Sequence, residues 1–189
     1  MANIASVAYV IEGPALNLQR IQEAINKAIE DEEPKYEEYK TCRYLGFTEE
    51  ELAGYRLGGD IKDEPELENG VLRFWSEERW GLQDFAEIFG KKFPDIEVYW
   101  VVEEPGLEIF RTNDKEGKYF SDRYLIDTCI DGIYNLEYFK TEQAAYKWLD
   151  KLTHGRVKSQ EDVETFNGDY EDSDAADENW IYIHEFKIG

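Results

Sequence analysis

Residues 69–111 constrain the fold of this chain more than any other stretch. They hold an apolar run at 71–75, apolar residues spaced by three and four positions at 82–89, and the alternating run IEVYWVVEE at 96–104. Spacing by three and four is typical of a helix with one buried face, and alternation is typical of a strand that is buried on one side. The stretch therefore predicts a strand, a helix and a strand in succession.

The N-terminal third predicts a further strand and helix. Residues 4–11 are rich in β-branched and aromatic side chains, and apolar residues then recur at helical spacing over 18–29. We interpret residues 35–68 as an insertion, because turn-forming residues surround a single short helix there. That helix is predicted by the capping-box pair Thr48 and Glu51.

The C-terminal part predicts a hairpin and a helix. Strand-like runs at 118–130 and 132–139 flank the dipeptide Asp131-Gly132, which is a strong signal for a tight hairpin turn. Thr141 can then cap a helix whose apolar residues face inward over 144–152.

An acidic segment precedes the C-terminus. Residues 161–178 contain nine acidic residues and no basic ones, so we expect an acidic loop over 156–179 and a closing strand over 180–188. The resulting element order predicts a single α+β domain over residues 1–189. Its sheet is largely antiparallel, with the helices packed on one face.

Charge restricts the classes of partner. The chain has 43 acidic and 21 basic residues, for a formal net charge of −22. A field of that sign repels phosphate groups, so we expect no direct binding to nucleic acid and none to an anionic membrane. The partner that it favours is a protein with a basic surface. The sequence does not specify an oligomeric state.

The sequence also predicts a cytoplasmic location. The N-terminus lacks the basic region and cleavage site of a signal peptide, and no run approaches the roughly 20 apolar residues of a membrane span. Cys42 and Cys129 lie far apart and beside apolar residues, so we expect buried free thiols.

The first two thirds of the chain resemble the YubB ferredoxin-like family, whose members are plasmid- and phage-borne proteins of unsettled activity. The resemblance rests on a strand that ends at Gly13 and on four motifs: Asn3, Phe74-Trp75-Ser76, Phe93-Pro94 and Glu104-Pro105-Gly106. It implies a ferredoxin-like sheet and a mobile-element context. It implies no mechanism.

The acidic segment contains a candidate metal site. Asn167, Asp169 and Glu171 fall at the first, third and fifth positions of a calcium loop, with Glu178 at the twelfth, but Asp172 occupies the position that needs glycine. The two histidines are not near a cysteine, which disfavours zinc. We therefore expect no metal and no cofactor.

Catalysis finds little support in the sequence. Paired carboxylates such as Glu77-Glu78 and Glu103-Glu104 could serve acid–base chemistry, but such pairs are expected by chance among 43 acidic residues. A phosphate-binding loop and a nucleophile motif are both missing from the sequence. We expect a binding protein rather than an enzyme. The alternative is a small-molecule enzyme that uses paired carboxylates, with or without a divalent cation.

Aromatic residues in predicted strands supply candidate binding residues. On an open sheet they could form a stacking platform, a protein-binding face, or simply packing for the insertion and termini; these residues are Trp75, Tyr99, Tyr119, Tyr134 and Tyr138. The net charge favours protein binding over nucleic-acid binding, and a mimic of nucleic acid is the sharper version of this hypothesis. The selected binding residues are Trp75, Tyr99, Glu171, Asp172 and Asp174.

Overall fold

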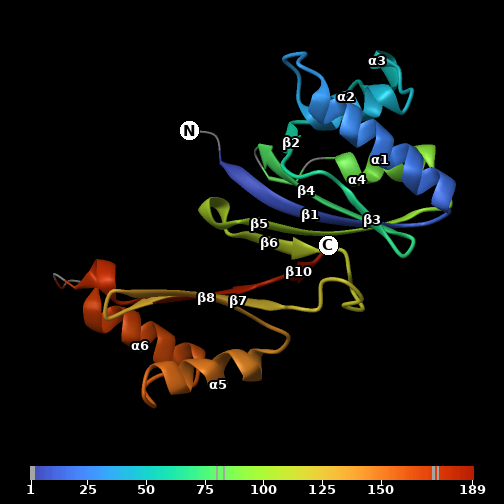
Figure 1. Cartoon of the computed structure of the whole chain (residues 1–189). Coiled ribbons are helices and arrows are strands. Elements are labelled where there is room, and N and C mark those ends of the chain that lie inside the picture. The colour runs from blue at the N-terminus through green and yellow to red at the C-terminus, as the bar shows by residue number, and fades with distance from the viewer. Residues whose placement is uncertain (1–2, 80, 83, 172, 174) are drawn as a thin grey trace. The chain divides into compact units, whose positions relative to one another are not determined.

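The computed structural model describes residues 3–79, 81–82, 84–171, 173 and 175–189. It divides into two compact units, where the sequence led us to expect one domain: unit 1 is Met1–Lys115 with Gly189, and unit 2 is Glu116–Ile188 (Figure 1). The division has a physical basis, because the two buried apolar clusters share no residue. Both units combine helices with antiparallel strands, so the α+β class is confirmed.

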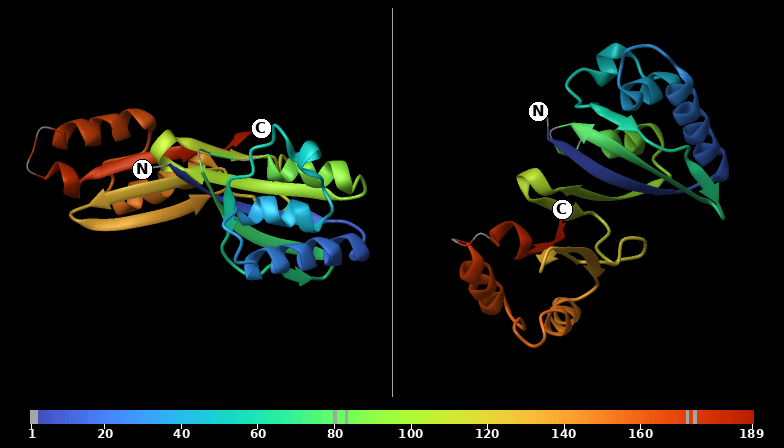
Figure 2. Two further views of the ribbon diagram at one scale, coloured as in Figure 1. Left: turned by 90° about the horizontal axis from the view of Figure 1, so that it is seen from above. Right: turned by 60° about the vertical axis from the view of Figure 1, so that its left-hand side comes forward.

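Unit 1 is an antiparallel sheet with helices on one face. Along its path the strands lie in the order β6-β5-β1-β4-β2, and β3 also pairs with β4. Helices α1, α2 and α4 lie on the same side of these strands (Figures 1 and 2). The elements are β1 (Ile4–Glu12), α1 (Ala15–Glu30), α2 (Glu37–Tyr44), α3 (Glu49–Leu52), β2 (Gly59–Ile61), β3 (Glu66–Glu68), β4 (Val71–Arg79), α4 (Phe85–Lys92), β5 (Glu97–Glu104), the 3-10 helix η1 (Pro105–Leu107) and β6 (Ile109–Thr112).

The core of unit 1 is built on alternate residues of β1. Val7, Tyr9 and Ile11 are buried, and the strand register places Tyr9 between Phe74 on β4 and Trp100 on β5. Burial of every second residue is what a strand covered on one face requires. The predicted strand at 4–11 and helix at 18–29 are confirmed by β1 and α1.

The expected insertion proves to contribute to the sheet. The capping box of Thr48 and Glu51 is confirmed at α3, where each side chain bonds the other residue's backbone. Within residues 59–68, however, β2 and β3 lie end to end along β4 and extend the sheet by one interrupted strand. Their strand character escaped prediction because each is only three residues long and is bounded by turn residues.

Unit 2 is a smaller sheet, in the order β8-β7-β9, with both of its long helices on one face (Figure 1). The predicted hairpin is confirmed, and Asp131 and Gly132 both have positive φ angles, of 52° and 75°. This is the signature of a type I′ turn. The elements are β7 (Tyr124–Ile130), β8 (Ile133–Phe139), α5 (Glu142–Leu152), α6 (Gln160–Tyr170), the 3-10 helix η2 (Ala176–Glu178), β9 (Trp180–Glu185) and β10 (Lys187–Ile188).

The acidic segment is largely helical, so the expected loop over 156–179 is wrong for residues 160–170. Ser159 caps α6 by accepting a hydrogen bond from the Asp162 amide, and Val163 and Phe166 bury the inner face of the helix. Acidic side chains in the first turn also interact favourably with the helix dipole. Composition predicted a loop because it counts charges and ignores their position on the helix.

The helices of both units are short and amphipathic. Over the described residues, none is long and apolar enough to cross a membrane.

Candidate functional site

The sheet of unit 2 carries aromatic side chains on the face that its helices leave uncovered. Even-numbered residues of β7, such as Ile126, pack against α5 and α6, so the odd-numbered residues of β7 and their partners in register lie on the other face. We call this surface the aromatic face. It comprises Tyr134, Leu136 and Tyr138 of β8 and Trp180, Tyr182 and His184 of β9.

The rings of the aromatic face form a continuous row. The centroids of Tyr134 and Trp180 are 6.1 Å apart, those of Trp180 and Tyr182 are 5.2 Å apart, and those of Tyr182 and His184 are 6.4 Å apart. These spacings lie in or near the range of favourable aromatic pairs. Tyr134 and Tyr182 are nevertheless 59% and 54% exposed. Rings held in place by their neighbours yet open to solvent are suited to binding.

One carboxylate lies at the centre of this face. Asp127 on β7 is in register with Leu136 on one side and Tyr182 on the other. Tyr134 hydrogen-bonds to it, and the pKa of Tyr134 is raised by desolvation, by this hydrogen bond and by the charge of Asp127. The Oδ1 atom of Asp127 is buried and accepts no hydrogen bond within the described part of the chain. The centre of the face is therefore negative.

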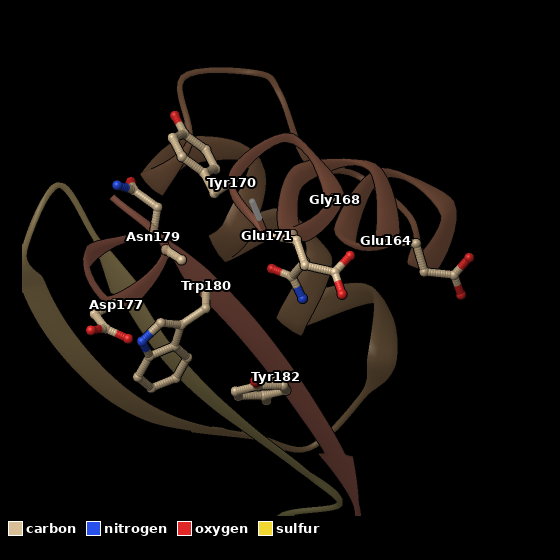
Figure 3. Close-up of a pocket in the computed structure, with 10 residues that line it drawn as sticks. Glu164, Gly168, Tyr170, Glu171, Asp177, Asn179, Trp180 and Tyr182 are labelled. Carbon is tan, nitrogen blue, oxygen red and sulfur yellow. The ribbon is translucent and has the colours of Figure 1, made fainter. Parts of the chain in front are cut away.

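A pocket of about 630 Å³ adjoins the aromatic face at β9 (Figure 3). We call it the acidic pocket. Two of its residues, Trp180 and Tyr182, also belong to the aromatic face, and Figure 3 shows both projecting from β9 on the same side. The remaining lining residues come from α6, η2 and the segments around them: Glu164, Asn167, Gly168, Tyr170, Glu171, Ala176, Asp177 and Asn179.

Two asparagines fix the walls of the acidic pocket. Asn167 on α6 donates to the Ile181 carbonyl oxygen at 2.8 Å and accepts from the Ile181 amide at 2.9 Å, as a neighbouring strand would. Asn179 accepts from the Asp131 amide at 3.0 Å and donates to the Ala175 carbonyl oxygen at 3.3 Å. The helix, the strand and the hairpin turn are thereby joined, so the pocket has a defined shape.

Helix α6 already binds one cation with its own side chains. The guanidinium carbon of Arg156 lies 4.7 Å from the ring centroid of Phe166 and 5.7 Å from that of Tyr170. The same group forms an ion pair with Asp169 at 3.1 Å. A guanidinium held between rings and a carboxylate is the arrangement that the acidic pocket would offer to a cation from outside.

The structure separates the residues that the sequence selected. Trp75 and Tyr99 are half-buried on the helix-free side of the unit 1 sheet, where the Trp75 indole donates to Asp63 and the Tyr99 hydroxyl donates to Glu97 at 2.6 Å. Both side chains therefore already have partners.

Of the selected acidic residues, Glu171 lines the acidic pocket in unit 2. Asp172 and Asp174 lie outside the described residues. Sequence reasoning missed Trp180 and Tyr182, which were assigned only to a closing strand. Their alternation with apolar residues in β9 was the available signal, because alternate residues of a strand share a face.

The adjacent carboxylates of β4 do not face each other. Glu77 and Glu78 are neighbours on β4 and therefore point to opposite faces of the sheet. Glu78 instead meets Glu38 of α2, and both side chains are completely buried. The Ser76 hydroxyl contacts both, at 3.0 Å from Glu78 and 3.4 Å from Glu38.

The surroundings of this buried pair favour the protonated form of Glu38. Burial, the charge of Glu78 and the hydrogen bond between the two groups raise the pKa of Glu38 well above its ordinary value. The Tyr9 hydroxyl donates to Glu78, and the Gly59 amide donates to Glu38 at 3.0 Å. Gly59 permits this contact because a Cβ atom there would collide with the Glu38 carboxylate. A pair so enclosed joins α2 and β2 to the sheet and is closed to a substrate.

The structure also bears on the candidate calcium loop and on the two cysteines. Asn167 and Asp169 lie within α6, so their side chains project around a helix and are bonded to Ile181 and Arg156. In the part of the chain that the structure describes, no three potential metal ligands converge.

Both cysteines are buried free thiols, as predicted. Burial and the charge of Glu38 raise the pKa of the Cys42 thiol, which makes it a poor nucleophile.

The acidic pocket and the aromatic face together form one surface of unit 2, joined through Trp180 and Tyr182. Rings and carboxylates lie beside one another over this surface, and its walls are fixed by side-chain hydrogen bonds. Comparison with known proteins finds no matching family model, no matching curated protein and no matching solved structure.

Proposed function

We propose that this chain is a non-enzymatic binding protein that engages another protein through the acidic pocket and the aromatic face of unit 2. The observation that carries the proposal is the position of Trp180 and Tyr182, whose rings belong to both surfaces. Tyrosine and tryptophan are the preferred anchors of protein interfaces, because each buries a large area and loses little conformational entropy.

The partner surface is basic. Glu164, Glu171 and Asp177 line the pocket beside the rings, and a lysine or arginine side chain would meet both kinds of group there. The net charge of −22 also attracts a basic protein from a distance. We propose that the partner is a nucleic-acid-binding protein whose basic groove accepts this surface in place of a phosphate backbone. The buried free thiols of Cys42 and Cys129 suit a cytoplasmic location.

We also infer that unit 1 is ferredoxin-like, as the resemblance to the YubB family implies. The strand order β5-β1-β4-β2, with α1 after β1 and α4 after β4, supports a βαββαβ arrangement. Helices α2 and α3 would then be additions between the first helix and the second strand. This assignment gives unit 1 a scaffold role and leaves binding to unit 2.

The proposal is tested by capture from host lysate, with the tagged full-length protein as bait and elution along a sodium chloride gradient. A pocket variant and a control variant each lose three negative charges, so they share the same net charge. The pocket variant is Glu164→Gln, Glu171→Gln and Asp177→Asn, and the control is Glu64→Gln, Glu66→Gln and Glu68→Gln, all exposed residues.

We expect the wild type and the control variant to retain a basic nucleic-acid-binding protein that elutes as salt rises, because salt screens exposed charges. The pocket variant should lose most of this protein. Equal loss from both variants would contradict a role for the pocket and indicate only a general charge effect. A captured partner that is indifferent to salt would contradict the mimic and leave the aromatic face as the contact.

A further inference from the structure

A second pocket lies in unit 1 and is lined by the end of α1, by α2 and by the first residue of α3. Its volume is about 350 Å³, near the lower end of the range of about 300–1,000 Å³ that is usual for small-molecule sites. We call it the α2 pocket, because Tyr39, Lys40, Arg43 and Tyr44 of α2 form much of its lining. It shares no residue with the acidic pocket of unit 2.

The ammonium of Lys40 is buried at this pocket without a carboxylate partner. Lys40 is 5% exposed and donates one hydrogen bond, to the Asp31 carbonyl oxygen at 2.6 Å. This bond satisfies a carbonyl group at the end of α1 but uses only one of the three N–H groups. Asp31 and Glu37 feel the charge of Lys40, yet Lys40 forms no ion pair within the described residues. A buried charge is costly unless it is paired, so this ammonium is suited to an anion.

Arg43 brings a second cation to the same pocket. Residues three apart on a helix are neighbours on its surface, and Lys40 and Arg43 both line the pocket from α2. The Nη1 atom of Arg43 donates to the Phe47 carbonyl oxygen at 2.7 Å, and in the part of the chain that the structure describes Arg43 has no ion pair either. Its planar guanidinium has further N–H groups, in the geometry that binds a carboxylate through two hydrogen bonds. Two such cations are unexpected in a chain with 43 acidic and 21 basic residues.

Two of the three carboxylates that line the α2 pocket already have partners. The Oδ1 atom of Asp31 accepts from the Glu33 amide at 2.9 Å, and its Oδ2 atom accepts from the Tyr44 hydroxyl at 2.7 Å. Glu33 pairs with Lys35 at 3.0 Å. The third carboxylate, Glu49, has neither a hydrogen bond nor an ion pair to its side chain over the described ranges. The pocket therefore offers two cations and one carboxylate to a ligand.

We propose that the α2 pocket binds a free α-amino acid in its zwitterionic form. The ligand carboxylate accepts hydrogen bonds from Lys40 and Arg43, and the ligand ammonium pairs with Glu49. Its side chain lies against Tyr39 and Tyr44, which favours an apolar or aromatic amino acid. A zwitterion suits this pocket better than a phosphate, because the neighbouring carboxylates and the net charge of −22 repel a dianion.

The proposal is tested by an NMR titration of the full chain, in which amide chemical shifts report both affinity and position. The ligands are L-phenylalanine, hydrocinnamate, which lacks the ammonium, and phenethylamine, which lacks the carboxylate. We expect L-phenylalanine to shift the amides of α2 and of Glu49, and hydrocinnamate to do so with roughly tenfold lower affinity. Phenethylamine should leave these amides unchanged, because it offers nothing to Lys40 and Arg43.

Three results of this titration would overturn the proposal. One is that L-phenylalanine shifts no amide of α2. Another is that phenethylamine shifts the α2 amides as strongly as L-phenylalanine, which would mean that only the carboxylates bind. The third is that inorganic phosphate binds as tightly as L-phenylalanine, which would indicate an unselective anion site. Shifts confined to unit 2 fall under the first result, so the test is separate from that of the partner proposed for the acidic pocket.

Two variants assign the contacts of the ligand. Arg43 is exposed, so Arg43→Gln should fold normally and weaken L-phenylalanine binding by roughly tenfold or more. Lys151→Gln loses the same charge at an exposed position of unit 2 and should bind like the wild type. Glu49→Gln removes the partner of the ammonium, so L-phenylalanine and hydrocinnamate should then bind equally. Unchanged affinity in Arg43→Gln, or a persistent preference for L-phenylalanine in Glu49→Gln, would overturn the proposal.

Discussion

The two units place their aromatic rings in opposite environments. In unit 1, Tyr9 stacks on Phe74 with centroids 5.0 Å apart, and Phe85 lies 5.9 Å from Tyr9 and 4.6 Å from Phe89. All four of these side chains are buried. In unit 2 a comparable row of rings lies on the helix-free face and remains open to water. The same residue types therefore stabilise one unit and form the surface of the other.

The difference follows from how much of each sheet is covered. Three helices cover one face of the larger sheet, and α5 and α6 cover one face of the smaller sheet with a smaller apolar cluster. On the uncovered face, rings contribute little to folding because they stay hydrated. Large exposed apolar patches commonly mark interaction sites, and this is why we propose the aromatic face as a binding surface.

Truncating one ring in each unit should give the largest difference in stability between the two units. Phe85→Ala removes a fully buried ring and should lower the free energy of unfolding by about 3–5 kcal/mol, because a cavity remains in the core. Tyr182→Ala, on the aromatic face, should change it by less than about 0.5 kcal/mol. Urea titration followed by far-UV circular dichroism measures both. Equal losses would mean that the aromatic face is packed like a core.

The buried carboxylates of unit 1 should make its stability depend on pH. Folding raises the pKa of Glu38 above the ordinary 4.5. At pH values between 4.5 and the folded pKa, the folded protein therefore holds a proton that the unfolded chain has lost. The stabilisation is complete below pH 4.5 and is lost as the pH rises through the folded pKa, at up to about 1.4 kcal/mol per pH unit.

The variant Glu38→Gln isolates this effect, since the amide keeps a donor for Glu78 at every pH. Its stability should become higher than that of the wild type at alkaline pH, while the control Glu50→Gln, at an exposed position, should follow the wild type. Thermal unfolding between pH 5 and pH 9 provides the measurement. Parallel curves for Glu38→Gln and the wild type would argue against a shared proton.

The contact between α6 and β9 should have a smaller but local effect. Asn167→Ala removes two hydrogen bonds to Ile181 and leaves its backbone exposed at a sheet edge, so we expect a loss of about 1–2 kcal/mol. Amide exchange at Ile181 should accelerate, whereas amides of β1 in unit 1 should not change. Uniform acceleration across the chain would indicate global destabilisation instead.

The smallest expected effect concerns the start of α6. Ser159→Ala removes the side chain that accepts from the Asp162 amide, and the loss of such a cap costs about 1 kcal/mol. The helical signal in far-UV circular dichroism should fall slightly, and α6 should fray at its first turn. Ser159→Asp keeps an acceptor and should retain the wild-type stability. An unchanged signal in Ser159→Ala would show that α6 does not depend on this cap.

Features set by neighbouring residues were predictable from the sequence. The capping box of Thr48, the Asp131-Gly132 hairpin and the burial of both cysteines follow from local chemistry, and the structure confirms each. Helix α6 was missed because its two buried residues, Val163 and Phe166, are few among many charges.

Features that depend on distant residues were not predictable. Glu38 and Glu78 are forty positions apart, and nothing local indicates that they share a proton. Likewise, Glu171 was selected for its charge, but its neighbours Trp180 and Tyr182 are brought to it only by the packing of α6 against β9. The sequence showed that these rings alternate with apolar residues along one strand. It did not show which face of the sheet the helices would cover.

Binding through the aromatic face is tested most directly by comparing two exposed tyrosines. The basic partner recovered from lysate is titrated against the wild type, Tyr182→Ala in unit 2 and Tyr44→Ala in unit 1, whose rings are 54% and 47% exposed. We expect Tyr182→Ala to weaken binding by about tenfold or more, as for an anchor residue, and Tyr44→Ala to leave the affinity unchanged. Equal affinity of Tyr182→Ala and the wild type would contradict the claim that unit 2 binds through its aromatic face and acidic pocket.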